Sequence, residues 1–194
     1  MRVRTLLGIV ASTAAVALGG TAPALATTVD IPASKACVIY SSYSGRACDA
    51  VATGDYFGAT QGLIQFDLSS IPAGADINSA TMSLAINYDP DGDAGFTGLQ
   101  EVSEPWDTTH VSWFTGDGTN VWDGAPYRAH GMIEPDSVGS LWVDWDVLGF
   151  VNNVYYSGAP NYGLSLNNNA ASHFVVFFYP SSSHPPKLTV DYTL

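Results

Sequence analysis

Apolar and polar residues alternate with a period of two along three segments of the chain, which are residues 63–68, 82–88 and 187–194. Successive side chains of a β-strand point to opposite faces, so this pattern predicts strands with one buried face. Shorter strands are expected at 141–145 and at 164–166. Residues 174–179 are apolar at every position, which predicts a central strand covered on both faces.

One segment has helical spacing instead. Asp146 is the expected N-cap of this helix, and Gly158 followed by Pro160 is expected to end it. The predicted helix is short and amphipathic and covers one end of the sheets. Many strands, turn-rich connections and a single helix predict an all-β fold, a two-layer β-sandwich. The apolar positions of the helix are Val147, Phe150, Val151, Val154 and Tyr155.

The N-terminus has the three parts of a secretory signal peptide in their usual order. Arg2 and Arg4 supply the positive region, residues 6–19 form an apolar stretch, and Ala24-Leu25-Ala26 supplies the small residues that a signal peptidase reads. We therefore expect residues 1–26 to be removed, leaving one extracellular domain over residues 27–194. An uncleaved anchor is the alternative, but the apolar run is shorter than the roughly 20 residues that a membrane span needs.

The net charge of the chain limits which classes of molecule it can bind. The full chain has a net charge of −12, and removal of the leader would leave four basic residues against eighteen carboxylates, hence −14. A surface of this kind repels phosphate backbones and anionic lipids. We therefore expect no nucleic-acid partner and no membrane insertion after cleavage. A glycan ligand should be neutral rather than anionic, unless a metal ion bridges the charges.

The chain has two cysteines, Cys37 and Cys48. In an oxidising compartment these two are expected to form a disulfide. Closing a loop of this length stabilises a fold by about 2–3 kcal/mol in the chain-entropy model. The alternative is a pair of metal-binding thiolates, for which the sequence offers no suitably spaced third and fourth ligand.

A series of short motifs resembles the DNRLRE domain family, part of which is grouped as carbohydrate-binding module family 96. The resemblance covers most of residues 27–194 in the order of the family. It implies a jelly-roll-like β-sandwich that binds extracellular polysaccharide. The motifs are Leu63-Ile64-Gln65-Phe66-Asp67-Leu68-Ser69, Ile71-Pro72-Ala73-Gly74-Ala75, Pro105-Trp106, Val111-Ser112-Trp113, Trp145-Asp146-Val147, Asn161-Tyr162-Gly163-Leu164 and Pro186-Lys187-Leu188-Thr189-Val190.

An acidic turn is the candidate metal site. Asp89, Asp91 and Asp93 alternate with Pro90 and Gly92, and three carboxylates spaced in this way can direct oxygen atoms toward one Ca²⁺. The spacing is not that of an EF-hand loop. The alternative is a solvated turn that uses Asp and Gly for their backbone preferences. Calcium is therefore a possible cofactor, and both interpretations stand at this point.

The candidate sugar-binding residues are Trp122, Asp123, Tyr127 and Arg128, which follow one another in a loop. Aromatic rings accept the C–H faces of sugars, while charged and amide groups bind the hydroxyls. The alternative is that Trp122 folds inward and caps an open end of the sheets. The remaining tryptophans occupy strand or motif positions, and packing in the core is expected for them. They are Trp106, Trp113, Trp142 and Trp145.

The sequence contains no recognisable catalytic constellation. Glu101 and Glu104 lie three residues apart, so in a strand they would point to opposite faces and could not flank one glycosidic bond. Hydrogen bonds to backbone N–H groups account for Asp67 and Asp146. The sequence favours a secreted, non-catalytic polysaccharide-binding module. An adhesive or structural surface protein, and a small polysaccharide-degrading enzyme, are the alternatives.

Overall fold

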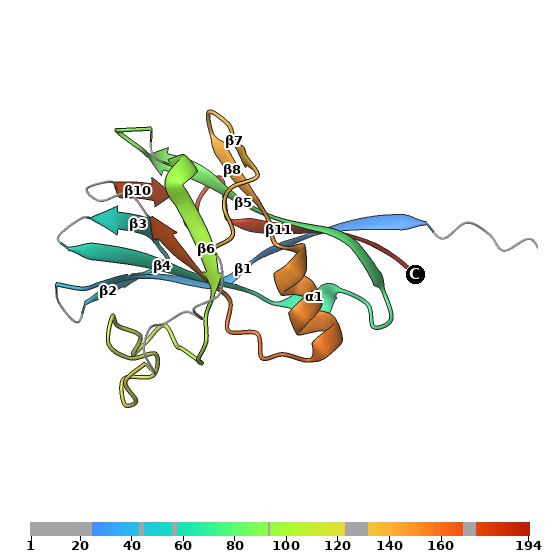
Figure 1. Ribbon diagram of the computed structural model, residues 1–194, viewed down its shortest axis with the longest axis horizontal. Helices are drawn as coiled ribbons and strands as arrows, with labels where there is room; N and C mark the ends of the chain where they lie inside the picture. The colour runs from blue at the N-terminus through green and yellow to red at the C-terminus, as the bar shows by residue number, and fades with distance from the viewer. Residues whose placement is uncertain (1–24, 43–44, 56–57, 93, 123–131, 169–173) are drawn as a thin grey trace, which may run out of the picture.

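The computed structural model describes residues 25–42, 45–55, 58–92, 94–122, 132–168 and 174–194, and these residues form a β-sandwich with one α-helix (Figure 1). The predicted all-β class and the single helix are confirmed. Two short 3-10 turns, Leu68–Ser70 and Ala94–Phe96, and the helix α1 (Leu148–Ser157) interrupt the strands. The strands are β1 (Ala26–Tyr40), β2 (Arg46–Cys48), β3 (Val51–Asp55), β4 (Ala59–Phe66), β5 (Asp76–Tyr88), β6 (Thr97–Glu101), β7 (Ser137–Val138), β8 (Trp142–Asp146), β9 (Leu164–Asn168), β10 (Phe174–Phe177) and β11 (Lys187–Thr193).

The two sheets share their longest strands, β1 and β5. In the first sheet the order is β7-β8-β5-β11-β1, with residues 26–32 of β1 paired to β11. Residues 33–40 of β1 belong to the second sheet, where they pair with β4. That sheet also contains β2, β3, β6, β9 and β10. All of these pairings are antiparallel. Because β1 pairs with strands of both sheets, it joins the two layers covalently.

The main core lies between the sheets. Its largest fully buried side chains include Phe66, Met82, Trp145 and Phe177. Trp145 is completely buried, and its indole N–H donates a hydrogen bond of 2.9 Å to the carbonyl oxygen of Thr97. A buried indole needs such a partner because its polar N–H has left water. The prediction that Trp145 packs in the core is confirmed.

The strand β1 was not predicted, because its alternation changes phase. Ile31 and Ala36 belong to the main core, whereas Cys37 and Ile39 face the opposite side of the second sheet. A bulge between Ala33 and Lys35 produces this change. An extra residue in one strand shifts every later side chain to the other face, so a period-two pattern does not run through the strand.

The helix α1 ends at the predicted Gly158, but its N-cap is Val147, one residue after the predicted Asp146. A side-chain oxygen of Asp146 accepts a hydrogen bond of 2.9 Å from the N–H of Leu148, and Gly158 ends the helix with a φ of 64°. The hydroxyl groups of Tyr155 and Tyr156 accept hydrogen bonds from the backbone N–H groups of Ala75 and Ile77. The helix therefore holds the turn that leads into β5.

The strand β10 differs from its prediction in one respect. It is central, since β3 and β5 pair with its two edges. Val175 and Phe177 are fully buried, but Phe174 and Val176 are only half-buried. The expectation that both faces are covered is therefore wrong, because among the residues that the structure describes the face with Phe174 and Val176 stays partly accessible.

Candidate functional site

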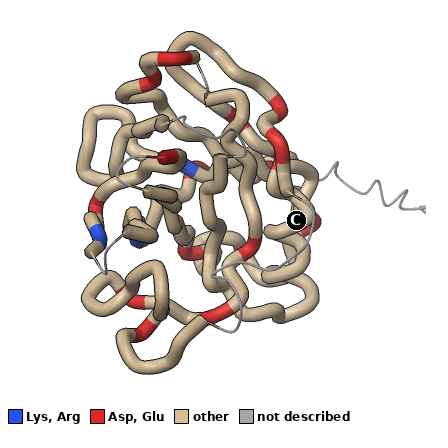
Figure 2. Tube along the Cα trace, turned by 60° about the vertical axis from the view of Figure 1, so that its left-hand side comes forward, with Lys and Arg blue, Asp and Glu red and all other residues tan. Residues whose placement is uncertain are grey.

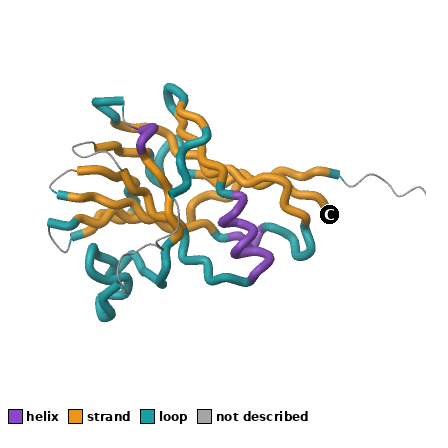
Figure 3. The backbone as a smooth tube through the Cα atoms, viewed as in Figure 1, coloured by secondary structure: helices purple, strands orange, loops and turns teal. Residues whose placement is uncertain are grey.

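Residues 102–122, which we name the covering loop, pack on the outer face of the second sheet. Figure 3 shows this long irregular segment beside the strands. Its apolar side chains meet outward-facing residues of β1 and β4 and form a second core, separate from the main one. The buried members of the second core are Cys37, Ile39, Leu63, Val102, Trp106, Val111 and Trp122.

Trp122 faces this second core. Its side chain is 5% exposed, and its indole N–H donates a hydrogen bond of 3.1 Å to the carbonyl oxygen of Ser112. The prediction of an exposed ring for sugar stacking is therefore wrong for Trp122, because the loop folds back on the sheet and buries the indole. The other predicted sugar-binding residues, Asp123, Tyr127 and Arg128, lie outside the described residues.

The predicted disulfide between Cys37 and Cys48 is confirmed. The two cysteines are register partners on the neighbouring strands β1 and β2. Cys37 is completely buried in the second core, whereas Cys48 lies at its border. The bond therefore ties the short edge strand β2 to the strand that supports the covering loop.

The acidic turn after β5 is described at Asp89 and Asp91, while Asp93 lies outside the described residues. A side-chain oxygen of Asp89 accepts a hydrogen bond of 3.0 Å from the N–H of Ala94, and Asp91 is exposed. Among the residues that the structure describes, no three acidic, histidine or cysteine side chains lie close enough to hold a metal ion. A calcium site at this turn would therefore depend on Asp93.

The outer face of the first sheet is polar, and we name it the polar face. Unlike the second sheet, it carries hydroxyls, carboxylates and one lysine at the outward positions of four neighbouring strands. None of its members belongs to either apolar core. The residues of the polar face are Thr28 and Asp30 of β1, Thr81 and Ser83 of β5, Trp142, Asp144 and Asp146 of β8, and Lys187, Thr189 and Asp191 of β11.

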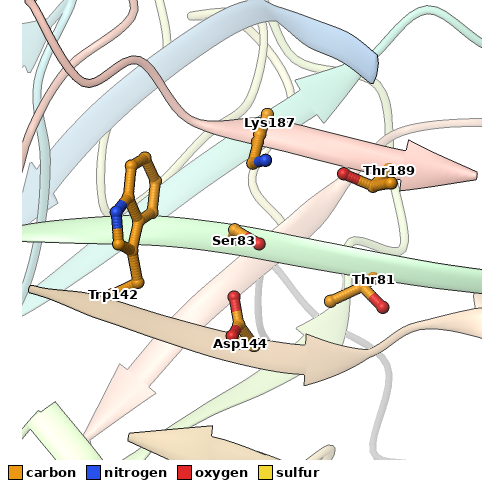
Figure 4. A pocket seen from close by; sticks show the side chains of 6 residues that line it. All are labelled: Thr81, Ser83, Trp142, Asp144, Lys187 and Thr189. Atoms are coloured by element: carbon orange, nitrogen blue, oxygen red, sulfur yellow. The ribbon is translucent and has the colours of Figure 1, made fainter. Parts of the chain in front are cut away.

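An open cleft of about 370 Å³ lies on the polar face (Figure 4). The strand register explains its shape: Ser83 lies between Asp144 on one neighbouring strand and Lys187 on the other. The next row places Thr81 beside Thr189. In the figure the Trp142 ring stands at one end of the cleft and the two threonines lie at the other. The cleft therefore has an aromatic wall and a polar floor.

Trp142 is half-buried, and its ring has His184 and Lys187 as neighbours. The ring of His184 meets it edge-on at 6.1 Å between centroids, and the Lys187 Nζ lies 5.9 Å from the centre of a Trp142 ring. The prediction that Trp142 packs in the core is therefore wrong. The signal in the sequence was its spacing from Trp145: residues three apart in a strand face opposite sides, so only one of the two tryptophans could enter the core.

Hydrogen bonds within the sheet hold several polar groups of this face in place. A side-chain oxygen of Asp144 accepts a hydrogen bond of 3.0 Å from the Ser137 hydroxyl. The Thr189 hydroxyl donates to Asp30 at 2.6 Å, and the Lys187 Nζ lies 3.9 Å from the same carboxylate. Side chains that are already ordered lose less entropy when a ligand binds.

Ser83 and Asp191 show two different states of polar groups on this face. Ser83 is only 6% exposed, and it lines the floor of the cleft between Asp144 and Lys187. A hydroxyl at the floor of a cleft can both donate a hydrogen bond to a ligand and accept one from it. Asp191, in contrast, accepts hydrogen bonds from the hydroxyls of Thr28 and Ser79, which lower the pKa of its carboxyl group.

The chemistry of the cleft is suited to holding a sugar. Glycoside hydrolysis by the usual mechanism needs two carboxyl groups on either side of the scissile bond. Among the residues that line this cleft, Asp144 is the one carboxylate. An aromatic face together with hydroxyl, carboxylate and ammonium groups is the arrangement that orients a sugar.

Comparison with known proteins agrees with this chemistry. The model of carbohydrate-binding module family 96 matches residues 50–192, which is well over half of the chain. No curated protein matches the sequence. In the described residues, no helix is long and apolar enough to cross a membrane. The matched range begins after β1 and β2, and it contains the residues of β5, β8 and β11 that line the cleft. Because the match covers most of the sequence, the chain belongs to carbohydrate-binding module family 96.

Proposed function

We propose that this chain is a secreted, non-catalytic module that binds an extracellular polysaccharide in the cleft beside Trp142. The observation that carries the proposal is the half-buried Trp142 ring in one cleft with the Ser83 hydroxyl, which Asp144 and Lys187 flank. The ring would take the C–H face of one sugar unit, and the polar floor would bind its hydroxyls. An open cleft on a sheet admits an internal unit of a polymer, whereas a closed pocket would accept only an end.

Charge supports a neutral polymer as the ligand. Figure 2 shows acidic residues on many segments of the chain and few basic ones. Asp144 and Lys187 balance one another within the cleft, while the whole chain has a net charge of −12. A polyanion would approach against this field. The disulfide and the N-terminal leader pattern support an extracellular location, and N-terminal sequencing of the exported protein should begin at Thr27.

Calcium assistance is a separate part of the proposal, and it rests on Asp89, Asp91 and Asp93 in the turn after β5. These residues would hold the ion by carboxylate oxygens, which Ca²⁺ prefers. The test is the thermal unfolding midpoint at millimolar calcium with and without EDTA. A midpoint that rises with calcium in the wild type, but not in Asp91→Asn, supports a site here. An unchanged midpoint overturns it.

The glycan proposal is tested by isothermal titration calorimetry with neutral oligosaccharides, after a glycan array has identified the series that binds. Trp142→Ala should weaken binding by about 2 kcal/mol or more, as for an aromatic hot spot, which is roughly thirtyfold in Kd. Phe114→Ala is the matched control, because Phe114 is an exposed aromatic residue on the covering loop. Equal affinity in both variants would place the site elsewhere.

Two outcomes would favour the alternative functions. If the wild type binds no glycan on the array, with or without calcium, an adhesive or structural role replaces the proposed one. If it releases reducing ends or unsaturated sugars from the polysaccharide that it binds, the module is catalytic. A reducing-sugar assay on the same samples separates these outcomes.

A further inference from the structure

A second open cleft, of about 330 Å³, lies between β1 and the covering loop. Its walls come from four parts of the chain: β1, the end of β2 with the turn after it, the covering loop at Thr108, and the connection between β10 and β11 at Pro180. Most of its lining precedes or borders the start of the range matched by the family model. The family match therefore does not account for this cleft. The lining residues are Ser34, Lys35, Ala36, Cys48, Asp49, Thr108 and Pro180.

The side chains at the second cleft are fixed in position, as those of the first cleft are. The Lys35 Nζ lies 4.0 Å from the centre of the Trp106 ring and donates a hydrogen bond to the Trp106 carbonyl oxygen. An ammonium group has three N–H donors, so Lys35 retains donors for a ligand. A side-chain oxygen of Asp49 accepts a hydrogen bond of 2.6 Å from the Ser181 hydroxyl. Each cleft thus combines one lysine, one aspartate and small hydroxyl-bearing side chains.

One connection, residues 178–186, contributes to both clefts. His184 packs against Trp142 at the first cleft, and Pro180 lines the second. The strands also link them, because Lys187 of the first cleft is the register partner of Pro32, which is two residues before Ser34 of the second. A strand spacing of about 5 Å and a perpendicular rise of about 7 Å over two residues place the Cα atoms of Lys187 and Ser34 about 8 Å apart. A single extended polymer can span that distance.

We infer that the two clefts are subsites for one polysaccharide chain, with the second subsite formed by Ser34, Lys35, Asp49 and Thr108. The inference rests on the proposed function of the first cleft. A chain that is already bound at Trp142 meets the second subsite at a high effective concentration. Even a weak second contact then raises the affinity for long oligosaccharides while leaving that for short ones unchanged.

The test measures affinity against ligand length by calorimetry. The probes are cello-, xylo-, manno- and malto-oligosaccharides, from disaccharide to hexasaccharide. In the wild type, the series that binds should tighten by at least tenfold once the oligosaccharide is long enough to reach the second cleft. Thr108→Arg places a long side chain in that cleft and should remove this gain, with disaccharide affinity unchanged.

Two controls keep the result interpretable. Thr109→Arg adds the same charge at an exposed neighbouring position outside the lining, and it should behave as the wild type does. Ser34→Arg blocks the cleft from β1 instead of the loop, and it should reproduce Thr108→Arg. Circular dichroism and the unfolding midpoint check that each variant is folded.

The outcomes separate the two proposals. Affinity that does not depend on length in the wild type, or a length gain that survives in both blocking variants, overturns the second subsite and leaves the first intact. Failure of the wild type to bind any of the oligosaccharides overturns the proposed function of the Trp142 cleft, and the second subsite with it.

Discussion

The outer faces of the two sheets differ in how far they are covered. On the second sheet, outward-facing Cys37, Ile39 and Leu63 are fully buried under the covering loop. On the first sheet, outward-facing Asp30 and Thr189 remain accessible, and a cleft opens between the strands. Both faces belong to similar antiparallel strands, so backbone geometry does not distinguish them. The chemistry of the outward side chains decides which face is packed and which is left for a ligand.

The strand β1 has an exposed polar outer side in its first part and a covered apolar outer side in its second part. Before the bulge its outward residues include Thr28 and Asp30, and after the bulge they include Cys37 and Ile39. The first pair hydrogen-bonds to β11 and the second pair packs against the covering loop. One strand thus supports the proposed binding face and the stabilising face, and the Lys35 cleft lies at the transition.

The largest expected effect separates two tryptophans. Trp122→Ala removes a buried indole from the second core and should lower the free energy of unfolding by about 3–5 kcal/mol. Trp142→Ala, on the polar face, should cost less stability and should abolish most glycan binding. Urea denaturation and calorimetry on both variants check this contrast. If the two variants lose equal stability, the division between a packed face and a binding face fails.

The disulfide should matter mainly to the covered side of the molecule. Replacing both cysteines, Cys37→Ala together with Cys48→Ala, should lower the free energy of unfolding by about 2–3 kcal/mol, because the unfolded chain gains freedom. Hydrogen exchange should rise first in β2 and in the covering loop, which the bond and the second core hold together. Uniform loss of protection in the β8 and β11 amides would contradict this expectation.

Close packing beneath the covering loop makes a smaller, steric prediction. A Cβ at Gly116 would lie 2.4 Å from the Pro105 carbonyl oxygen and 2.7 Å from the Trp122 ring. Gly116→Ala should therefore cost about 1–3 kcal/mol, as overpacking does. Gly149 is the matched control, since it lies in α1 with nothing near its Cβ position, and Gly149→Ala should stabilise by about 0.5–1 kcal/mol.

The smallest expected effect concerns acid stability of the covering loop. Backbone N–H groups of Asn120 and Thr119, and then the Asn120 side chain, donate hydrogen bonds to Asp117 and lower the pKa of its carboxyl group. A lowered pKa contributes stability above the unfolded value of about 4, which is lost as pH falls through the folded value. Asp117→Asn should therefore flatten the fall of the unfolding midpoint below pH 4. An unchanged pH profile would show that this turn does not contribute.

The elements with uninterrupted patterns could be predicted from the sequence. The strands β4, β5 and β11 and the helix α1 have regular periods. Gly158 ends the helix as expected, whereas the N-cap is Val147, one residue after the predicted Asp146. The bulged β1 and the two-residue β7 could not be found in this way, because a phase shift or a short length removes the period.

The candidate site was harder to predict than the fold. The sequence around Trp122 and Trp142 does not show which of the two is buried. Trp122, the candidate for sugar stacking, is buried, whereas Trp142, which was expected in the core, is partly exposed. The covering loop folds over one of them because Ile39 and Leu63 offer it an apolar surface. Trp142 faces neighbours such as Ser83 and Lys187, which keep water or a ligand beside it.

The sequence by itself determined that alternating side chains build two sheets, that one helix covers their end, and that two cysteines pair. These are local properties, since a strand period or a helix cap depends on residues a few positions apart. The tertiary structure alone decided which sheet face is covered and which residues share a cleft. Those outcomes depend on contacts between β5, β8 and β11. These strands lie far apart along the chain, so no periodic pattern in the sequence indicates that they are neighbours.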